Sequence, residues 1–265
     1  FTCRPGKNIG EGMSQTAHIP DYPKALLQHQ KYCAALEKCG VRVTLLPEDP
    51  SFPDKCFIND MAVVTGPLAV ISNFASESPR QGEQKDVAAA LAMEKFLKFI
   101  TPPGRLDAGD VLQIGDQFFI SLSDYTNPAG AAQLALFLKE YGYNVTTLTL
   151  PENNTLRLST AATDLGHNRL LIREELARHF SFITYDKIIV PYTERRAGAA
   201  LMINGILLLP AGCPETLEEV RSLGIPVIEV DISEFEKMNG TLRCLSLRSE
   251  AAESMYQQDK IRKYA

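Results

Sequence analysis

The sequence lacks any pair of cysteines at Cys-x-x-Cys spacing, although it holds six cysteines in 265 residues. That spacing is typical of zinc sites and of redox dithiols, so its absence argues against both. We therefore expect no metal ion and no other cofactor. Cysteines scattered in this way usually behave as small buried hydrophobic residues, and the pattern favours a reducing, cytoplasmic compartment.

Long apolar runs and clusters of positive charge are missing as well. No stretch approaches the roughly 20 apolar residues that a membrane-spanning helix needs, so we predict no membrane segment. The formal net charge is −5 and no run of Lys or Arg occurs, which argues against nucleic acid as a partner. Residues 1–5 lack the basic and apolar regions of a signal peptide, although a chain that begins at Phe1 is compatible with removal of an upstream segment.

What the sequence does contain is an alternation of short apolar strands and helical stretches. Helices are expected at 22–39, 83–99, 128–141 and 216–223. Glycines that separate two apolar runs, and so mark hairpins, recur roughly every 40 to 50 residues, at Gly66, Gly115, Gly166 and Gly205. The pattern predicts an α/β protein in which a unit of hairpin, helix and strand repeats about five times around a ring.

The ring organisation carries two further predictions. The strand at 244–247 is expected to pair with the N-terminal strand and so to fasten the ring. No linker or change of composition interrupts the chain, so we expect one domain over 1–265, with a C-terminal tail from about residue 250. An ordinary mixed α/β sandwich is the alternative that the periodicity leaves open.

Four short segments carry side chains suited to chemistry, and each lies at the edge of an apolar strand. Taken singly, each has an ordinary interpretation, because an Asp beside a turn usually caps it and a Cys between leucines usually belongs to the core. In a ring of repeated units, however, equivalent strand edges meet at one mouth. The segments are FIND (57–60), LDAGDV (106–111), LRLST (156–160) and GTLRCLSL (240–247).

Together these segments resemble the dimethylarginine dimethylaminohydrolase family, within the larger group of arginine deiminases and amidinotransferases. The resemblance extends over residues 4–248 and is most specific at 106–135 and at CLSLR (244–248), while 20–47 agrees as well. It implies a five-bladed α/β propeller, the pentein fold, with a negative central pocket. It also implies hydrolysis of a small guanidino or amino-acid substrate such as dimethylarginine, and it is compatible with a homodimer.

The implied reaction needs three kinds of group. A cysteine thiolate attacks the guanidinium carbon, carboxylates hold the planar cation, and a proton carrier serves the leaving amine and then the water. The resemblance aligns Cys244 with the nucleophile and Asp60 with the guanidinium-binding carboxylate. Asp54 aligns with an aspartate of the preceding P-D-S string, and Asp107 with the acidic residue that orients the family's catalytic histidine.

The sequence departs from the family pattern where that histidine should stand. The family string is close to L-H-L-K-T, whereas this chain has LRLST, so Arg157 replaces the histidine. Arginine stays protonated and cannot shuttle a proton. It can still pair with Asp107 and favour the thiolate of Cys244.

Residues expected to contact the substrate differ too. Tyr125 stands where the family has an arginine that binds the substrate α-carboxylate, and Asn59 replaces an acidic residue. Arg80, which matches a second carboxylate-binding arginine, is retained. Among the four histidines, His18 lies in a segment (15–20) that resembles the family's lid over the pocket, so lid closure is one route to a replacement proton carrier.

Two functions of different kinds follow. An active hydrolase with a covalent thiouronium intermediate is favoured by Cys244, Asp60 and Asp107. A catalytically silent protein that binds a ligand or regulates another process is favoured by Arg157 and Tyr125. A substrate without an α-carboxylate is a third interpretation, compatible with Tyr125.

Overall fold

Strands in five small sheets form the β part of the computed structural model, which describes residues 1–12, 18–150 and 156–249. Four of the sheets share one plan: two strands form an antiparallel hairpin, and a third strand lies parallel to the second. A helical connection joins the second strand to the third. The first sheet holds β3 (Ala62–Thr65), β4 (Leu68–Ile71) and β5 (Phe96–Phe99), with α2 (Gln84–Leu91) as its helix, and the second holds β6 (Val111–Ile114), β7 (Gln117–Leu122) and β8 (Asn144–Thr149), with α3 (Pro128–Glu140). The third holds β9 (Ala162–Asp164), β10 (Arg169–Arg173) and β11 (Asp186–Val190), with α5 (Glu174–Ala177) and η4 (Phe180–Phe182). The fourth holds β12 (Leu201–Ile203), β13 (Ile206–Pro210) and β14 (Val227–Val230), with α6 (Pro214–Ser222).

The fifth sheet joins the two ends of the described chain. β1 (Thr2–Cys3) lies parallel to β2 (Leu45–Leu46), and α1 (Tyr22–Lys38) connects them. Thr2 also pairs antiparallel with Ser246, and the amide of Leu247 donates to the carbonyl of Phe1 at 3.0 Å. Pairing with the N-terminal strand is therefore confirmed at Ser246 and Leu247, whereas Cys244 and Leu245 of the expected strand lie in the short helix η6 (Leu242–Leu245) instead. Through this pairing the sheet repeats the plan of the other four, with residues from each end of the described chain.

Local sequence explains much of this plan. The hairpin between β12 and β13 turns at Asn204-Gly205, which have φ values of 48° and 79°. A two-residue hairpin turn of this kind needs positive φ at both positions, and Asn-Gly is the dipeptide best suited to it. Helix α3 begins at Pro128 after Asn127, whose side chain accepts a hydrogen bond from the amide of Gly130 at 2.8 Å.

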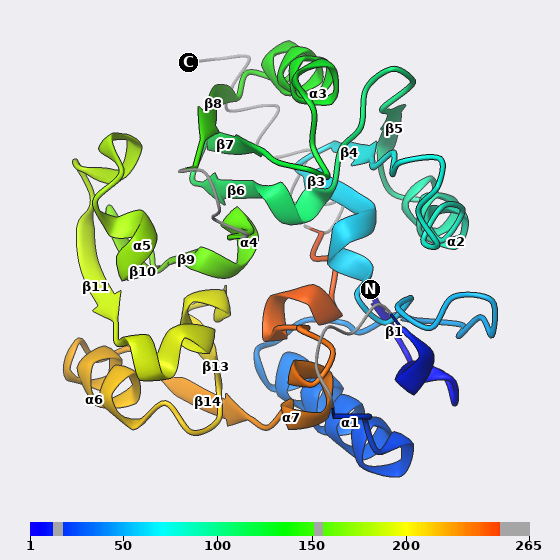
Figure 1. The fold of residues 1–265 in the computed structure, drawn as a ribbon. Coiled ribbons are helices and arrows are strands. Elements are labelled where there is room, and N and C mark those ends of the chain that lie inside the picture. Colours follow the sequence, from blue (N-terminus) through cyan, green and yellow to red (C-terminus); the bar gives the residue numbers. More distant parts are fainter. Residues whose placement is uncertain (13–17, 151–155, 250–265) are drawn as a thin grey trace.

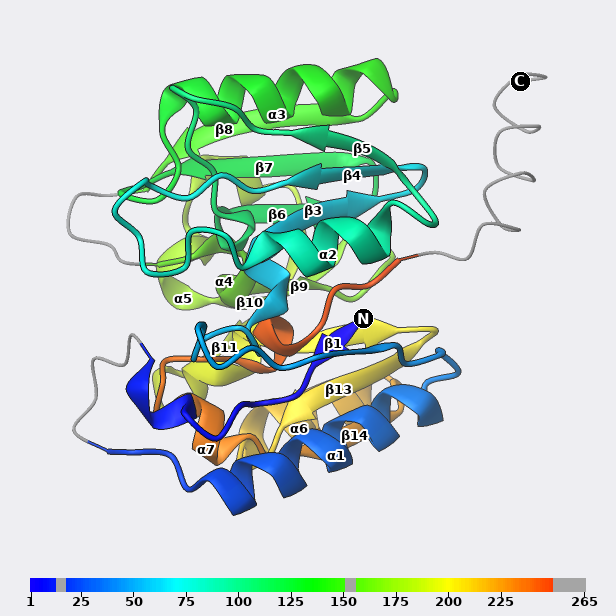
Figure 2. The same ribbon diagram turned by 90° about the vertical axis from the view of Figure 1, so that its right-hand side faces the viewer.

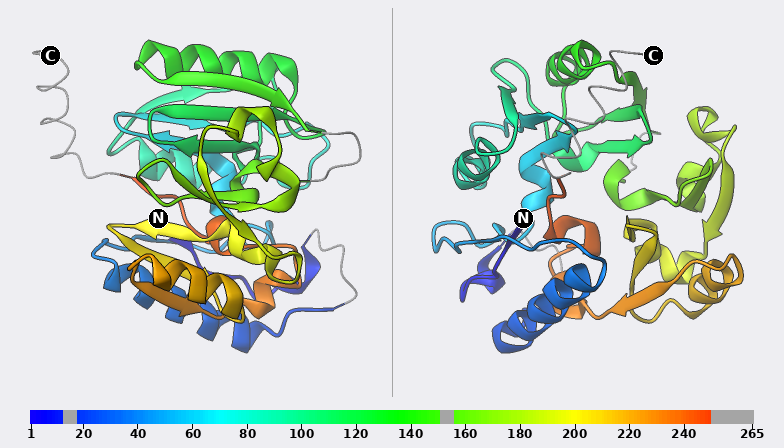
Figure 3. Two further views of the ribbon diagram at one scale, coloured as in Figure 1. Left: turned by 90° about the vertical axis from the view of Figure 1, so that its left-hand side faces the viewer. Right: turned by 180° about the vertical axis from the view of Figure 1, so that it is seen from behind.

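Short helices occupy the centre of the molecule. Figure 1 shows the sheets following one another around a common centre, and Figures 2 and 3 show α1 and α3 at opposite outer edges. One short helix precedes the hairpin of each of the four three-stranded sheets, and a further one precedes Ser246; along the series η6–η2–η3–α4–η5 each contacts the next. These helices are η2 (Ile58–Met61), η3 (Ala108–Asp110), α4 (Leu158–Ala161), η5 (Tyr192–Ala199) and η6 (Leu242–Leu245).

The apolar core is divided among the contacts between neighbouring sheets. Phe118 of β7 belongs to a cluster that joins the second sheet to the first, and Phe119 on the opposite face of the same strand packs toward Phe182 and the third. The alternation of side chains along a strand supplies both faces. α1 packs on the fourth sheet with α7 (Ser233–Glu236), while η1 (Ile9–Glu11) adds Ile9 to the same cluster. Each sheet is thus stabilised mainly by its neighbours.

Two expectations change. The helix predicted over 83–99 ends at Leu91, and Phe96–Phe99 forms β5 instead, because its backbone pairs in parallel with β4. The Ala-rich end of α2 favours a helix, so the periodicity of the sequence did not predict that the helix ends before β5. The five small sheets do not fit the two-layer sandwich alternative. The expected tail from about residue 250 lies outside the described residues.

A search of the described residues finds no helix with the length and apolar character needed to cross a membrane. All six cysteines are free thiols.

His29 makes the stability of the fold depend on pH. It lies on α1 with 2 % of its surface exposed, and burial lowers its pKa to about 4. The unfolded chain takes up this proton at a higher pH than the folded chain, so the free energy of unfolding falls as pH decreases through 6.5 toward 4. We expect protonation of His29 in the unfolded chain to lower the free energy of unfolding by about 2 kcal/mol when the pH falls from about 7.5 to about 5.

Urea unfolding of wild type and His29→Gln at both pH values measures this effect. On acidification, the free energy of unfolding of His29→Gln should fall by about 2 kcal/mol less than that of wild type. His167→Asn is the matched control, because His167 is exposed in a turn with φ 52°, a conformation that Asn tolerates. An equal loss in wild type and His29→Gln would contradict the assignment.

Candidate active site

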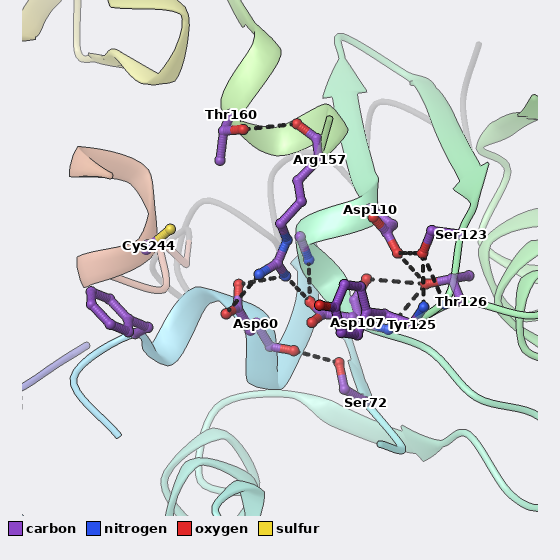
Figure 4. A network of polar contacts seen from close by, with 12 residues as sticks. Asp60, Ser72, Asp107, Asp110, Ser123, Tyr125, Thr126, Arg157, Thr160 and Cys244 are labelled. Carbon is purple, nitrogen blue, oxygen red and sulfur yellow. Dashed lines mark hydrogen bonds and ion pairs between the residues drawn. The ribbon is translucent and has the colours of Figure 1, made fainter. Parts of the chain in front are cut away.

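Four of the expected residues meet at the centre, each on a short helix or at its start. Asp60 lies in η2, Asp107 caps η3, Arg157 immediately precedes α4, and Cys244 lies in η6. The Asp107 carboxylate accepts from the amide of Gly109 at 2.8 Å, which fixes its orientation. Figure 4 shows the four side chains converging from these separate elements.

The guanidinium of Arg157 lies between two carboxylates. Its Nη2 forms an ion pair with Asp107 Oδ1, which confirms the expected pairing. The same nitrogen lies 3.0 Å from Asp60 Oδ1, and Nη1 donates to Asp60 Oδ2 at 3.3 Å (Figure 4). Gly109 makes this position possible, since a Cβ on that residue would overlap the guanidinium. One guanidinium thus contacts both carboxylates.

Arg80 contacts a different set of groups from the substrate carboxylate that the sequence led us to expect. Its Nη1 donates to Asp60 Oδ2 at 2.7 Å, and its Nε and Nη2 donate to Glu83 Oε2 at 3.0 and 2.9 Å. Nη2 also donates to the carbonyls of Asp54 and Phe57. A guanidinium has five N–H donors, and most of these are committed. In this structure Arg80 therefore orients Asp60.

Two hydroxyl groups bind the carboxylate of Asp110, and one of them also connects it to the backbone of Asp107. Thr126 Oγ1 donates to Asp110 Oδ2 at 2.7 Å and accepts from the Asp107 amide at 3.1 Å, while Ser123 Oγ donates to Asp110 Oδ2 at 2.6 Å (Figure 4). We did not single out these three residues from the sequence. The signal available was the second aspartate of LDAGDV together with the hydroxyl residues of SDYT (123–126).

The electrostatics of Asp107 are dominated by its burial. Only 4 % of the residue is exposed, and burial raises its pKa to about 7. Arg157 lowers the pKa, while Asp60 and Asp110 raise it. Burial thus opposes the ionised form of Asp107, while its ion pair with Arg157 favours that form.

Cys244 is also held in a buried position, with 6 % exposed. Thr241 Oγ1 lies 3.2 Å from its sulfur, a contact that the sequence did not reveal. Burial raises the pKa of Cys244, and Asp60 adds to the increase, whereas Arg157 and Thr241 lower it. Arg157 acts in the expected direction, but burial has the larger effect.

The remaining candidates lie around this group. Tyr125 is half exposed, and its ring centre is 6.0 Å from Arg157 Cζ, which places the ring over the guanidinium. Asp54 is buried before η2 with its carboxylate against Gly12. His18 is exposed, while residues 15–17 of the expected lid lie outside the described residues. No cluster of His, Cys, Asp and Glu suited to a metal ion occurs in the part of the chain that the structure describes.

Comparisons with known proteins agree with this geometry. Residues 14–167 match the sequence profile of a family described as "N,N dimethylarginine dimethylhydrolase, eukaryotic". A dimethylarginine dimethylaminohydrolase from Pseudomonas aeruginosa is 36 % identical over 92 % of this chain and 96 % of the relative. The chain belongs to the dimethylarginine dimethylaminohydrolase family. A second member, from Streptomyces coelicolor, is 32 % identical over 92 % of this chain and 94 % of its own length.

Solved structures extend the match within the dimethylarginine dimethylaminohydrolase family. The P. aeruginosa enzyme, as a Cys-to-Ser mutant complexed with citrulline, superposes with a TM-score of 0.88 at 34 % identity and covers 93 % of this chain and 97 % of its own. A His-to-Gly dimethylarginine dimethylaminohydrolase adduct with S-methyl-L-thiocitrulline gives 0.89 at 35 % identity, with the same coverage. The N-terminal domain of ArgZ, an arginine dihydrolase from cyanobacteria, shares the fold with a TM-score of 0.83 at 20 % identity, covering 94 % of this chain and 96 % of that domain.

Alkylation tests the influence of Arg157 on Cys244. At neutral pH we expect iodoacetamide to label Cys244 ahead of Cys3, Cys33, Cys39, Cys56 and Cys213. Arg157→Gln should slow the labelling of Cys244 by about tenfold or more, since an adjacent opposite charge shifts a pKa by roughly 1 to 3. Peptide mass spectrometry over time gives both rates.

Two controls accompany this measurement. Arg157→Lys keeps the positive charge and should retain most of the reactivity. Cys33 is only partly buried and lies on α1, so its rate provides an internal reference that neither substitution should change. A Cys244 rate unaffected by Arg157→Gln would show that Arg157 does not act on the thiol.

Proposed function

We propose that the protein is a hydrolase of guanidino compounds in which Cys244 is the nucleophile. The observation that carries this proposal is the convergence of Cys244, Asp60 and Asp107 from three separate short helices. Its relatives support it, because two are named dimethylarginine dimethylaminohydrolases and one is solved with citrulline.

The reaction proceeds in two stages. The Cys244 thiolate forms an S–C bond with the guanidinium carbon, the C–N bond to the leaving amine breaks, and the amine departs with a proton. Water then adds to the carbon of the thiouronium intermediate and loses its protons to the carrier and to solvent. The S–C bond breaks, which returns the thiolate and leaves a urea group as in citrulline.

Asp107 is the proton carrier that the site itself offers. Burial raises its pKa, which favours a protonated form that can donate to the amine, whereas the ion pair with Arg157 favours the ionised form and so limits this role. Asp60, oriented by Arg80, would hold the substrate cation. His18 is a second candidate carrier and would require closure of its segment over the site.

Arg157 limits this activity. It cannot transfer protons, and its guanidinium lies against the same carboxylates that a substrate guanidinium would contact. A substrate must therefore displace it. Tyr125 supplies no positive charge for an α-carboxylate, so the substrate class extends to guanidino compounds that lack one.

Citrulline release from dimethylarginine tests the proposal. Wild-type turnover should be weak or undetectable, and Arg157→His should raise it, because a titrating imidazole beside Asp107 restores proton transfer worth roughly 10²–10⁴-fold. Cys244→Ser is the negative control and should abolish product in both backgrounds. Wild-type turnover at ordinary enzymatic rates would mean that Arg157 does not limit the reaction, and His18→Ala and Asp107→Asn would then identify the proton carrier.

A second candidate is a catalytically silent protein that binds or senses a ligand. The observation that favours it is the occupation of the carboxylate pair by the chain's own guanidinium. In this interpretation the site is filled by Arg157 as though by an internal ligand, and external guanidinium is excluded.

Ligand binding by an Arg157→Ala variant tests whether Arg157 excludes external guanidinium from the carboxylate pair, which we call self-occupation. The variant leaves Asp107 without its ion pair and Asp60 paired with Arg80 alone, so methylguanidine should bind and raise the thermal unfolding midpoint. At a concentration one hundred times its dissociation constant, such a ligand stabilises by about 2.7 kcal/mol. Wild type should not respond, and Asp60→Asn in the Arg157→Ala background should lose the response. A wild-type shift equal to that of the variant would exclude self-occupation.

We also propose that the five sheets form a five-bladed propeller of pseudo-fivefold ββαβ repeats and that 1–265 is one domain. The common plan of the four three-stranded sheets supports this assignment, as does its repetition where the ends of the chain meet.

A further inference from the structure

A second polar space lies beside the candidate active site. It is a cavity of about 90 Å³ whose lining includes Asn59, Ser159, Arg243 and Arg248. Asn59 and Arg243 are the chain neighbours of Asp60 and Cys244, yet neither Asp60 nor Cys244 lines the cavity. The short central helices thus present alternate residues to two different spaces.

Two arginines face this cavity with neutral partners. Arg243 Nη2 donates to Thr163 Oγ1 at 3.3 Å and to the Ala200 carbonyl at 3.4 Å. Arg248 donates to the carbonyl and hydroxyl of Ser246 at 3.0 and 3.1 Å, and to Asn59 Oδ1 at 3.4 Å. Among the described residues, neither guanidinium forms an ion pair with a carboxylate.

This arrangement is electrostatically unfavourable by itself. Burial lowers the pKa of Arg243, and the charge of Arg248 lowers it further; Cys244, then Tyr32 and Asp164, act in the opposite direction. Burial also lowers the pKa of Arg248. Because arginine nevertheless stays protonated, the unfavourable interaction remains as a cost to folding. A negative partner would remove that cost.

Further donors in the cavity are unpartnered. Within the part of the chain that the structure describes, two buried atoms, the hydroxyl of Ser159 and the Nε of Arg243, have no hydrogen-bond partner. Buried polar groups in native proteins are nearly always paired, and an ion or water commonly accounts for an exception. A cavity needs only roughly 10–15 Å³ to hold one water, so about 90 Å³ accommodates a small polyatomic ion.

Asn59 is the side chain that reaches Arg248 from η2, and its amide oxygen is a neutral acceptor. Among the described residues, no carboxylate therefore balances the charge of Arg248 at this contact. A bound anion would supply that balance.

We propose that this cavity binds a small inorganic oxyanion of the phosphate or sulfate class, held by Arg243, Arg248 and Ser159. The planar guanidinium matches oxyanion geometry through paired N–H bonds. A tetrahedral ion offers acceptor oxygens in several directions, which suits donors that come from η6, from the segment after it and from α4. Cys244 does not line this cavity, although it lies close enough to raise the pKa of both arginines.

Calorimetry and thermal unfolding with inorganic phosphate and with sulfate test this site. Ionic strength is held constant with a bulky organic sulfonate that is too large for the cavity. Wild type should show saturable binding and a rising unfolding midpoint. Arg243→Gln and Arg248→Gln should each weaken binding by about tenfold or more, which corresponds to the loss of hydrogen bonds to a charged group.

Asn59→Asp provides a variant that removes neither arginine. It places a carboxylate next to Arg248, so it should raise the unfolding midpoint without added anion and abolish the response to phosphate. Arg157→Gln is the matched control for the candidate active site and should keep the response. Retention of binding in both Arg243→Gln and Arg248→Gln, its loss in Arg157→Gln, or an equal response to chloride would each overturn the proposal.

Discussion

Buried charge at the centre must be compensated, and the Arg157 contacts with Asp60 and Asp107 meet that requirement. Removing either partner from such a group leaves an isolated charge in a region with little water, which is strongly unfavourable. Any ligand that enters must therefore replace the guanidinium with another cation, or accept the cost of moving it. For the function proposed above, this requirement favours a cationic ligand such as a guanidinium over a neutral or anionic one.

The same requirement explains the surrounding hydrogen bonds. Arg80 compensates Asp60 from the side away from Arg157, while Thr126 and Ser123 satisfy Asp110. Together they hold the carboxylates in place, while burial raises the pKa of Asp107 and Arg157 lowers it. In the proposed function, proton transfer by Asp107 therefore competes with its ion pair to Arg157.

The repeated plan of the sheets concentrates polar groups at the centre. Short helices from successive units contact one another there, so consecutive residues on a single helix reach two separate spaces. Asp60 and Cys244 belong to the acidic space with Arg157, whereas Asn59 and Arg243 belong to the basic cavity.

The sequence by itself determined the local elements and the residues that could meet. The periodicity predicted α1 and the Asn204-Gly205 hairpin, and the four segments that resemble the family identified Asp60, Asp107, Arg157 and Cys244 before their geometry was known. These features depend on neighbouring residues or on short strings. Only the tertiary structure decided that 96–99 is a strand, that Arg80 contacts Asp60, that burial outweighs Arg157 at Cys244, and that Arg243 and Arg248 share a cavity. Strand pairing, ion pairs and pKa values depend on groups brought together from distant parts of the chain and on the exclusion of water, and no local pattern encodes these.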